Sequence, residues 1–200
     1  MSAGIILIVL LAGLGEHSAP PLKEAQETDF IEVAFEETST LPQTAPAPVP
    51  EFKAPKLAME DQFGASVTLA FPQEEPHVLF ATDRKGVDDT IRWYKAFEKR
   101  YGKTIPSYGL AQGKNIPAIL HPLVKRIIRK DVPQSVFLDW KNSQAEAWQF
   151  QSGQANMYVI APDGAVVFHG IGAMTDAKRD AFFAVLDRYA AEASTSVPKE

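Results

Sequence analysis

Hydrophobic positions after Lys56 follow two spacings, one typical of strands and the other of helices. Short continuous or alternating apolar runs predict six strands, at 67–71, 78–81, 107–111, 136–139, 156–161 and 165–169. Apolar residues three and four positions apart predict three helices, at 88–101, 119–128 and 176–191. The turn signal Pro162-Asp163-Gly164 predicts that the last two strands form a hairpin.

This order of elements predicts the α/β fold class. Strands that alternate with helices and end in an antiparallel hairpin plus one helix are expected to form a mixed sheet with helices on both faces. A further short helix is expected between 139 and 156. The domain is predicted at 57–192, with a flexible tail at 193–200.

The N-terminus carries an apolar run of ten residues at 5–14, followed by a small-residue pattern that ends at Gly15. This is typical of a secretory signal, although no Lys or Arg precedes the run. At about 1.5 Å per residue in a helix, the run spans about half of a bilayer core. Residues 1–15 therefore predict a signal peptide and an extracytoplasmic, periplasmic location. An uncleaved membrane anchor and an ordinary apolar N-terminus are the alternatives.

Residues 16–56 differ in composition from the domain. Seven of the fifteen prolines lie between 19 and 56, and the segment 16–56 has eight acidic and three basic residues. This composition predicts a proline-rich, acidic and disordered tether. Within it, the sequence DFIEVAF from Asp29 to Phe35 is more apolar. That stretch either packs on the domain, stays part of the linker, or docks a protein partner.

Charge and cysteine content exclude several classes of function. The net charge of −5 comes entirely from residues 16–56, since residues 57–200 carry seventeen acidic and seventeen basic side chains. A neutral domain does not have the basic surface of a nucleic-acid binder. The chain has no cysteine, which rules out disulfides, thiolate metal sites and thiol catalysis within it.

Several stretches of the domain occur in the order and spacing of a known fold family. They are Asp61-Gln62-Phe63-Gly64, VLFATDRKG at 78–86, VFLD at 136–139 and the hairpin YVIAPDGAVVFHGIG at 158–172. Together they resemble the redoxin branch of the thioredoxin fold, which includes peroxiredoxin-like and membrane-anchored thiol-disulfide exchange proteins. The resemblance covers about 60–190.

The departures from that family define the candidate site. By alignment, the two redox cysteines fall near Arg84 and Val87, and the family's cis-proline falls near Ala155 or Asn156. Because neither arginine nor valine supplies a thiolate, the chain by itself is not expected to be a cysteine-dependent oxidoreductase. It is similar to exported bacterial thioredoxin-like proteins that lack the redox motif.

The resemblance places a ligand or partner site at the degenerate redox position. The candidate residues are Thr82, Asp83, Arg84, Lys85, Gly86, Ala155 and Asn156. The first five lie where a strand gives way to a helix, and open α/β sheets place ligands at such junctions. The alternative is a solvated loop with ordinary helix capping.

Other features give weaker indications. The basic run KRIIRK at 125–130 is either a solvated helix face or a contact for an anionic membrane surface or for the acidic tether. The four histidines have no metal-ligand spacing, so neither a metal nor a cofactor is expected. Trp93, Trp140 and Trp148 are expected in the core, with an exposed ring as the alternative for Trp140, which comes just after a strand.

The sequence therefore favours an exported, non-catalytic thioredoxin-like domain that binds a protein partner or small ligand. Two alternatives stay open. One is a redox-associated component, antioxidant or thiol-disulfide, whose thiol a partner supplies. The other is a structural module of the cell envelope, in which the tether acts as a spacer.

Overall fold

The computed structural model describes residues 52–102, 104–114 and 116–195, with side chains described as far as 191. The predictions for 1–15, for 29–35 and for residues 16–51 of the tether lie outside the described residues. Within the described part, the chain already packs on the domain at Phe52, whose carbonyl accepts a hydrogen bond from Val166. At the other end, the last helix continues to Thr195.

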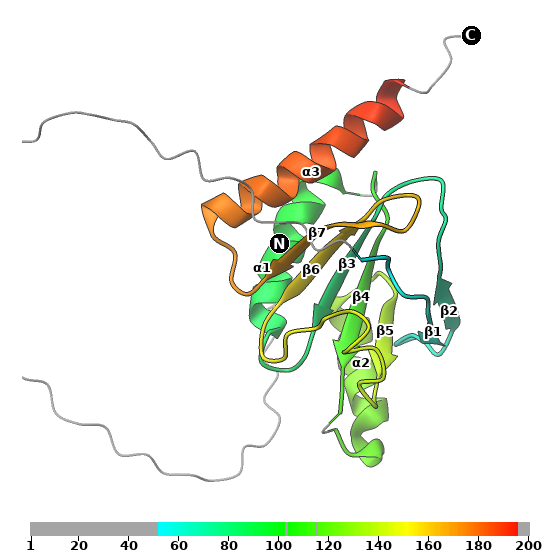
Figure 1. Ribbon diagram of the computed structural model, residues 1–200. Coiled ribbons are helices and arrows are strands. Elements are labelled where there is room, and N and C mark those ends of the chain that lie inside the picture. The colour runs from blue at the N-terminus through cyan, green and yellow to red at the C-terminus, as the bar shows by residue number, and fades with distance from the viewer. Residues whose placement is uncertain (1–51, 103, 115, 196–200) are drawn as a thin grey trace, which may run out of the picture. The chain divides into compact units, whose positions relative to one another are not determined.

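A five-stranded mixed sheet forms the centre of the domain (Figure 1), and it confirms the predicted fold class. The strand order is β5-β4-β3-β6-β7, with β3, β4 and β5 parallel and with β6 and β7 antiparallel to their neighbours. The strands are β3 (His77–Thr82), β4 (Ser107–Gln112), β5 (Val136–Asp139), β6 (Asn156–Ile160) and β7 (Val166–Ile171). Each lies within two residues of its predicted range.

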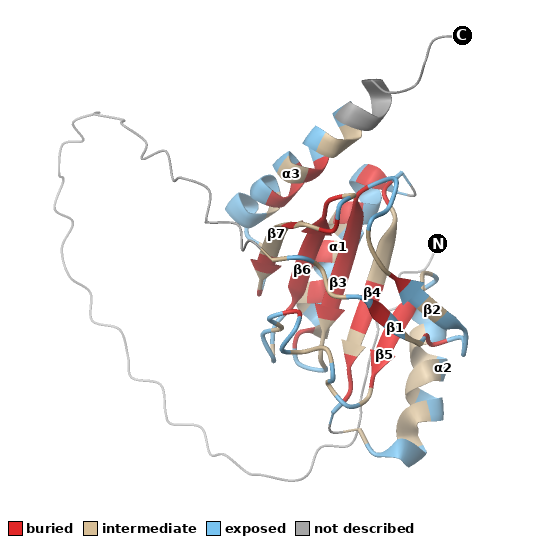
Figure 2. Ribbon diagram, turned by 45° about the vertical axis from the view of Figure 1, so that its right-hand side comes forward, coloured by how far each residue is buried: buried red, intermediate tan, exposed pale blue. Residues whose placement is uncertain are grey.

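Two helices cover one face of the sheet. They are α1 (Val87–Tyr101) and α3 (Asp176–Thr195), and Figure 2 shows their buried side facing the strands. Trp93 and Phe97 of α1 and Phe182 of α3 are fully buried and pack edge-on or tilted against one another. Burying an aromatic side chain of this size contributes about 2–3 kcal/mol each. The apolar spacing that predicted both helices therefore reflects one shared core.

The opposite face is covered by a strand hairpin and by turns. The hairpin consists of β1 (Leu57–Glu60) and β2 (Ser66–Leu69), and β1 was not predicted because its four residues show no clear alternation. The prediction of a short helix between 139 and 156 is wrong, since turns occupy 140–141 and 143–149 instead. Asp139 determines these turns: its carboxylate accepts hydrogen bonds from the backbone amides of Lys141, Ser143 and Gln144.

A third helix, α2 (His121–Asp131), begins after the 3-10 turn η1 (Ala118–Leu120) and lies beside β5 and the hairpin. Gln62 of the hairpin ties it in place, because its amide nitrogen donates to the carbonyls of Val132 and Gln134. The predicted helix at 119–128 exists, but no residue of α2 is fully buried. Ile119 is 87% exposed and Leu123 43% exposed.

Candidate functional site

The loop between β3 and α1 contains five of the candidate residues, and Asp83 holds it in place. One carboxylate oxygen of Asp83 accepts hydrogen bonds from the amides of Lys85 (2.9 Å) and Gly86 (3.2 Å). The other accepts from the hydroxyl of Ser152 and the amide of Gly153, each at 2.7 Å. Asp83 therefore stabilises its own turn and also joins it to the loop 151–155 across the sheet.

This arrangement affects the acidity of Asp83. Burial alone would raise its pKa, but the hydrogen bonds from Ser152, Gly153, Gly86 and Lys85 together outweigh burial. They hold the pKa of the carboxyl below its ordinary value of 3.8. Asp83 is therefore ionised at neutral pH, with its lone pairs already engaged by the protein. Its hydrogen bonding suits a structural role better than proton transfer.

Gly86 lies directly against the loop 151–155. A Cβ at this position would come within 2.3 Å of the carbonyl carbon and oxygen of Gln154 and within 2.8 Å of the amide nitrogen of Ala155. Such distances exclude every side chain unless one loop moves. The backbone of the opening turn and that of the facing loop are thus in direct contact, so no cleft separates them at this point.

The other two candidate residues are buried on the facing loop. Asn156 pairs with Ala81 in the sheet register, so the structure does bring the two predicted groups together. However, Ala155 and Asn156 are both fully buried. The Asn156 side chain donates to the carbonyls of Gln151 and Gln154, so it organises its own loop. Ala155 and Asn156 hold their side chains inside the protein.

Thr82 is half-buried and donates its hydroxyl proton to the carbonyl of Asp83. Arg84 and Lys85 are exposed. The candidate site therefore consists of a rigid turn that presents two cationic residues, supported from behind by Asp83, Gly86 and the loop 151–155. The turn could bind an anion or an acidic surface, and it contains no thiol.

The sequence analysis missed a buried amide at the same edge of the sheet. Gln112 ends β4, lies opposite Asp139 in the register and is 94% buried. Neither its nitrogen nor its oxygen has a partner among the described residues, and the same holds for the buried indole nitrogen of Trp148. A glutamine at the carboxyl end of a predicted parallel strand was the signal that could have drawn attention to it.

Substituting Gln112 by methionine is expected to raise the free energy of unfolding by about 1 kcal/mol, because an unpaired buried amide costs more than an apolar side chain of similar shape. Urea unfolding measures the change. Gln62→Met is the matched control: this buried glutamine makes three hydrogen bonds, so the same substitution should cost about 3 kcal/mol. A destabilised Gln112→Met protein would instead show that a water molecule or ligand satisfies the amide.

Trp140 stacks on the imidazole of His121, with ring centroids 3.7 Å apart and planes 10° apart. The His121 Nε2 lies 3.1 Å from the carbonyl of Ile116, to which it donates. This contact connects the end of β5 to the start of α2. The ring of Trp140 is therefore half-buried in a stack rather than free, whereas Trp93 and Trp148 are in the core as expected.

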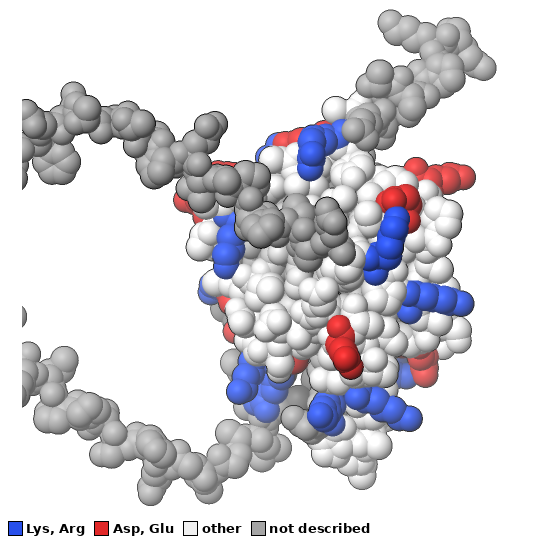
Figure 3. Space-filling view, in the orientation of Figure 1, with Lys and Arg blue, Asp and Glu red and all other residues white. Residues whose placement is uncertain are grey.

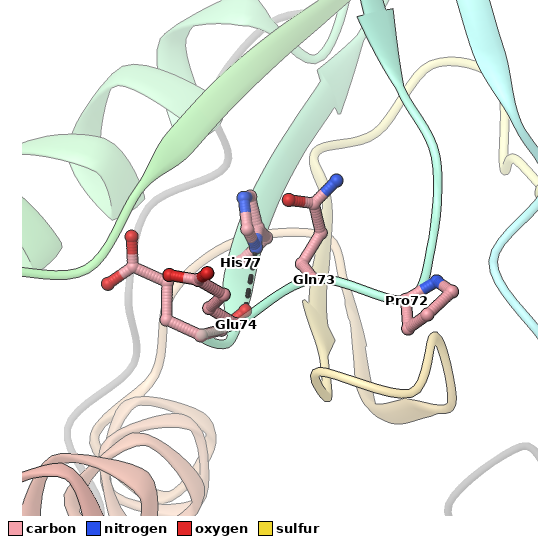
Figure 4. A pocket seen from close by; sticks show the side chains of 5 residues that line it. Pro72, Gln73, Glu74 and His77 are labelled. Atoms are coloured by element: carbon pink, nitrogen blue, oxygen red, sulfur yellow. Dashed lines mark hydrogen bonds between the residues drawn. The ribbon is translucent and has the colours of Figure 1, made fainter.

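A shallow recess of about 460 Å³ lies at the other end of β3, lined by Pro72, Gln73, Glu74, Glu75 and His77 (Figure 4). Nδ1 of His77 donates to the carbonyl of Glu75 (2.9 Å), and burial lowers the pKa of this imidazole. The recess is open and formed mainly by one loop. It is separated from the Asp83 turn by the length of β3.

His169 of β7 stacks on Tyr158 with ring centroids 4.3 Å apart, and its Nε2 is buried without a partner among the described residues. Burial lowers the pKa of His169 to about 4, from an ordinary value of 6.5. Between these two values the unfolded chain binds a proton that the folded chain excludes. This stabilising contribution is therefore complete above pH 6.5 and is lost as the pH falls through about 4.

We expect acidification across that window to lower the free energy of unfolding by about 1–2 kcal/mol through His169, after allowance for the partial exposure of the ring. His169→Phe keeps a ring on Tyr158 but cannot be protonated. Urea unfolding at about pH 7 and about pH 4.5 should show a smaller difference for His169→Phe than for the unsubstituted protein. Equal differences would contradict the assignment to His169.

No group of three or more acidic or histidine side chains in the described part of the chain is arranged to hold a metal ion. In the part of the chain that the structure describes, no helix is both long enough and apolar enough to span a bilayer.

No family model matches the sequence, and no curated protein matches it either. Solved structures do resemble the fold. The exposed lipoprotein thioredoxin Etrx1 of Streptococcus pneumoniae is 13% identical, with a TM-score of 0.53, and the match covers 67% of this chain and 99% of that one.

Two further structures give the same result. A DsbF homologue from Corynebacterium diphtheriae is 12% identical over 70% of this chain and 87% of that one, with a TM-score of 0.54. A putative thiol:disulfide interchange protein DsbE from Chlorobium tepidum is 16% identical over 68% and 96%, with a TM-score of 0.52. This chain thus has the thioredoxin-like fold of thiol-disulfide exchange proteins and contains no cysteine.

Proposed function

We propose that this protein is a non-catalytic thioredoxin-like domain that binds a protein partner through the turn 82–86. The proposal rests on the residues and the geometry at the position that corresponds to the family's redox site. By sequence alignment, the cysteines of the resembling family fall near Arg84 and Val87, and Asp83 and Gly86 fix the turn against the loop 151–155. The turn is preorganised for contact but has no thiol.

The cationic character of the turn indicates the chemistry of the partner surface. Lys85 is exposed next to Arg84, and the acidic side chain within the turn, Asp83, is already engaged by four hydrogen-bond donors. An acidic surface or a carboxylate would complement the two cations. A rigid turn also loses less conformational entropy on binding than a mobile one.

We place the protein outside the cytoplasm. The apolar run at 5–14 supports this location, and the similar S. pneumoniae protein is described as an exposed lipoprotein. Mass spectrometry of the mature N-terminus together with cell fractionation tests it. A cytoplasmic protein with an intact N-terminus would overturn the location but would not affect the binding proposal.

The absence of catalysis is tested by insulin reduction with dithiothreitol and by peroxide consumption. The purified chain should show no turnover above a heat-inactivated sample. A variant with Arg84→Cys and Val87→Cys serves as the positive control, because it places two thiols at the start of α1, where a helix N-terminus lowers thiol pKa. Turnover by the unsubstituted chain would contradict the proposal.

The binding turn is tested by cross-linking in an extracytoplasmic extract. Arg84→Ala with Lys85→Ala should reduce capture of the partner, whereas Lys95→Ala with Lys99→Ala, an equal loss of charge on an exposed face of α1, should not. Undiminished capture by the first variant would exclude the turn as the contact surface.

The alternative is a redox-associated component whose thiol comes from a partner. The fold of the similar thiol-disulfide exchange proteins favours it. It would be preferred if the captured partner were a thiol protein whose disulfide reduction became faster in the presence of this chain.

A further inference from the structure

The start of α2 projects an apolar side chain that the domain does not cover. Ile119, in the turn η1, is 87% exposed, and Leu123, one helical turn later, is 43% exposed. No side chain of η1 or α2 is fully buried. The most exposed large apolar side chain among the described residues thus sits on a projecting tip rather than in a groove.

Two lysines lie on the loops next to this tip. The amide of Lys114 donates to the side chain of Asn142 (3.1 Å), so the loop that carries Lys114 lies against the loop that carries Lys141 and Asn142. The stack of His121 on Trp140 brings the same loops against the start of α2. We call Lys114, Ile119, Leu123, Trp140 and Lys141 the α2 tip.

The charges of the α2 tip are not neutralised by the domain. Lys114 and Lys141 are exposed and form no ion pair with any residue that the structure describes, and the same is true of Arg126 on the next turn. Lys125, in contrast, pairs with Glu60 of the hairpin. Figure 3 shows lysine and arginine side chains next to the uncharged lower end of the molecule, where Figure 1 shows an end of α2.

We propose that the α2 tip is a contact site for an anionic lipid surface. Its chemistry matches the membrane interface: an aliphatic side chain that can enter the headgroup boundary, an indole nearby, and lysines at the level of lipid phosphates. A projecting tip suits a deformable lipid surface, whereas a protein partner would usually require a matching pocket. This inference does not depend on the proposed function of the turn 82–86.

The contact is expected to be weak and to act together with another means of membrane attachment. Each lysine or arginine near an anionic surface strengthens binding by about fivefold. The insertion of two apolar side chains into the lipid adds only a limited further gain in affinity. A few such contacts do not hold a protein on a membrane by themselves. They would orient a domain that another means of attachment holds at the membrane, with the carboxyl ends of β4 and β5 toward the lipid.

The test measures binding of the full chain to phosphatidylcholine vesicles with and without phosphatidylglycerol. The apolar run at 5–14 would bind both kinds of vesicle, so the informative quantity is the ratio of the two partition coefficients. The ratio should exceed one at low salt and fall toward one as salt is added. A ratio of one at low salt would overturn the proposal.

Variants locate the contact. Lys114→Gln with Lys141→Gln should lower the ratio by about 25-fold. Lys95→Gln with Lys99→Gln removes the same charge from α1 and should leave the ratio unchanged. Circular dichroism checks that each variant is folded, and all four lysines are exposed. Equal losses in the two variants would show a general charge effect and exclude the α2 tip.

Ile119→Ser separates insertion from simple charge attraction. It should lower binding to the anionic vesicles while the salt dependence is kept. Unchanged binding would mean that the apolar tip does not enter the lipid, and the proposal in this form would fail. If the ratio were one and the synthetic peptide DFIEVAFEE (residues 29–37) bound the tip instead, the occupant would be an acidic protein segment.

Discussion

Gly86→Ala is expected to lower the free energy of unfolding by about 3 kcal/mol, because the new methyl group would overlap the backbone of the facing loop. The contact of 2.3 Å involves the carbonyl of Gln154, which cannot move aside as the end of a flexible side chain could. Relief requires displacement of the loop 151–155, which the hydrogen bonds of Asp83 and Asn156 hold. Urea unfolding measures the change.

Gly64→Ala is the control for this substitution. Gly64 has a φ of 86°, so an alanine there is strained, but its Cβ would lie no closer than 3.5 Å to a neighbouring atom, the Glu60 carboxylate. The control should cost about 1 kcal/mol, the penalty of a left-handed conformation alone. If Gly86→Ala cost no more than Gly64→Ala, the two loops would not be in the close contact described.

Asp83→Ala is expected to destabilise the protein by about 2–3 kcal/mol, because three backbone amides and the Ser152 hydroxyl lose their common acceptor. Partial exposure lets water replace some of these bonds, so the cost stays below the sum of four. Amide hydrogen exchange should become faster in the loop 151–155 than in β6. Protection of that loop unchanged from the unsubstituted protein would contradict the bridging role of Asp83.

The same substitution should change the response to strong acid. The folded pKa of Asp83 lies below the ordinary value of 3.8. Its stabilising contribution is therefore present above pH 3.8 and is lost as the pH falls through the lower, folded value. As the pH falls below about 4, the Asp83→Ala protein should therefore lose less of its free energy of unfolding than the unsubstituted protein does. The loss through His169, which occurs at higher pH, should be the same in both proteins. If the free energies of unfolding of the two proteins fell in parallel below about pH 4, the contribution assigned to Asp83 would be contradicted.

Local patterns were sufficient for most of the secondary structure. The strand β5 was predicted at its observed bounds, and α1 was predicted within one residue. The first turn of α1 contains Asp88 and Asp89, and its last turn contains Lys99 and Arg100, so charges and periodicity agree along one element. The errors fall where local sequence is ambiguous, as in the four residues of β1 and the turns that follow Asp139.

The site was predicted only in part. The sequence located the turn 82–86 and brought Ala155 and Asn156 to it through the resemblance to a family. It gave no sign that Asp83 bonds to Ser152 and Gly153, about seventy positions away along the chain. It also gave no sign that Ala155 and Asn156 are buried, or that Gln112 has no partner.

The sequence by itself determined that this protein has the strand and helix order of a thioredoxin-like domain and that it contains no thiol. The order of elements follows from the period of apolar side chains, its likeness to a thioredoxin-like domain follows from the resemblance of several short stretches to that family, and the missing thiol follows from the absence of cysteine. Only the tertiary structure decided that the turn 82–86 is closed against the loop 151–155 and that the start of α2 projects from the domain. Those features depend on contacts between segments that are distant along the chain. Pairing of the strands brings such segments together, but neither segment carries a pattern of apolar residues that would reveal the contact.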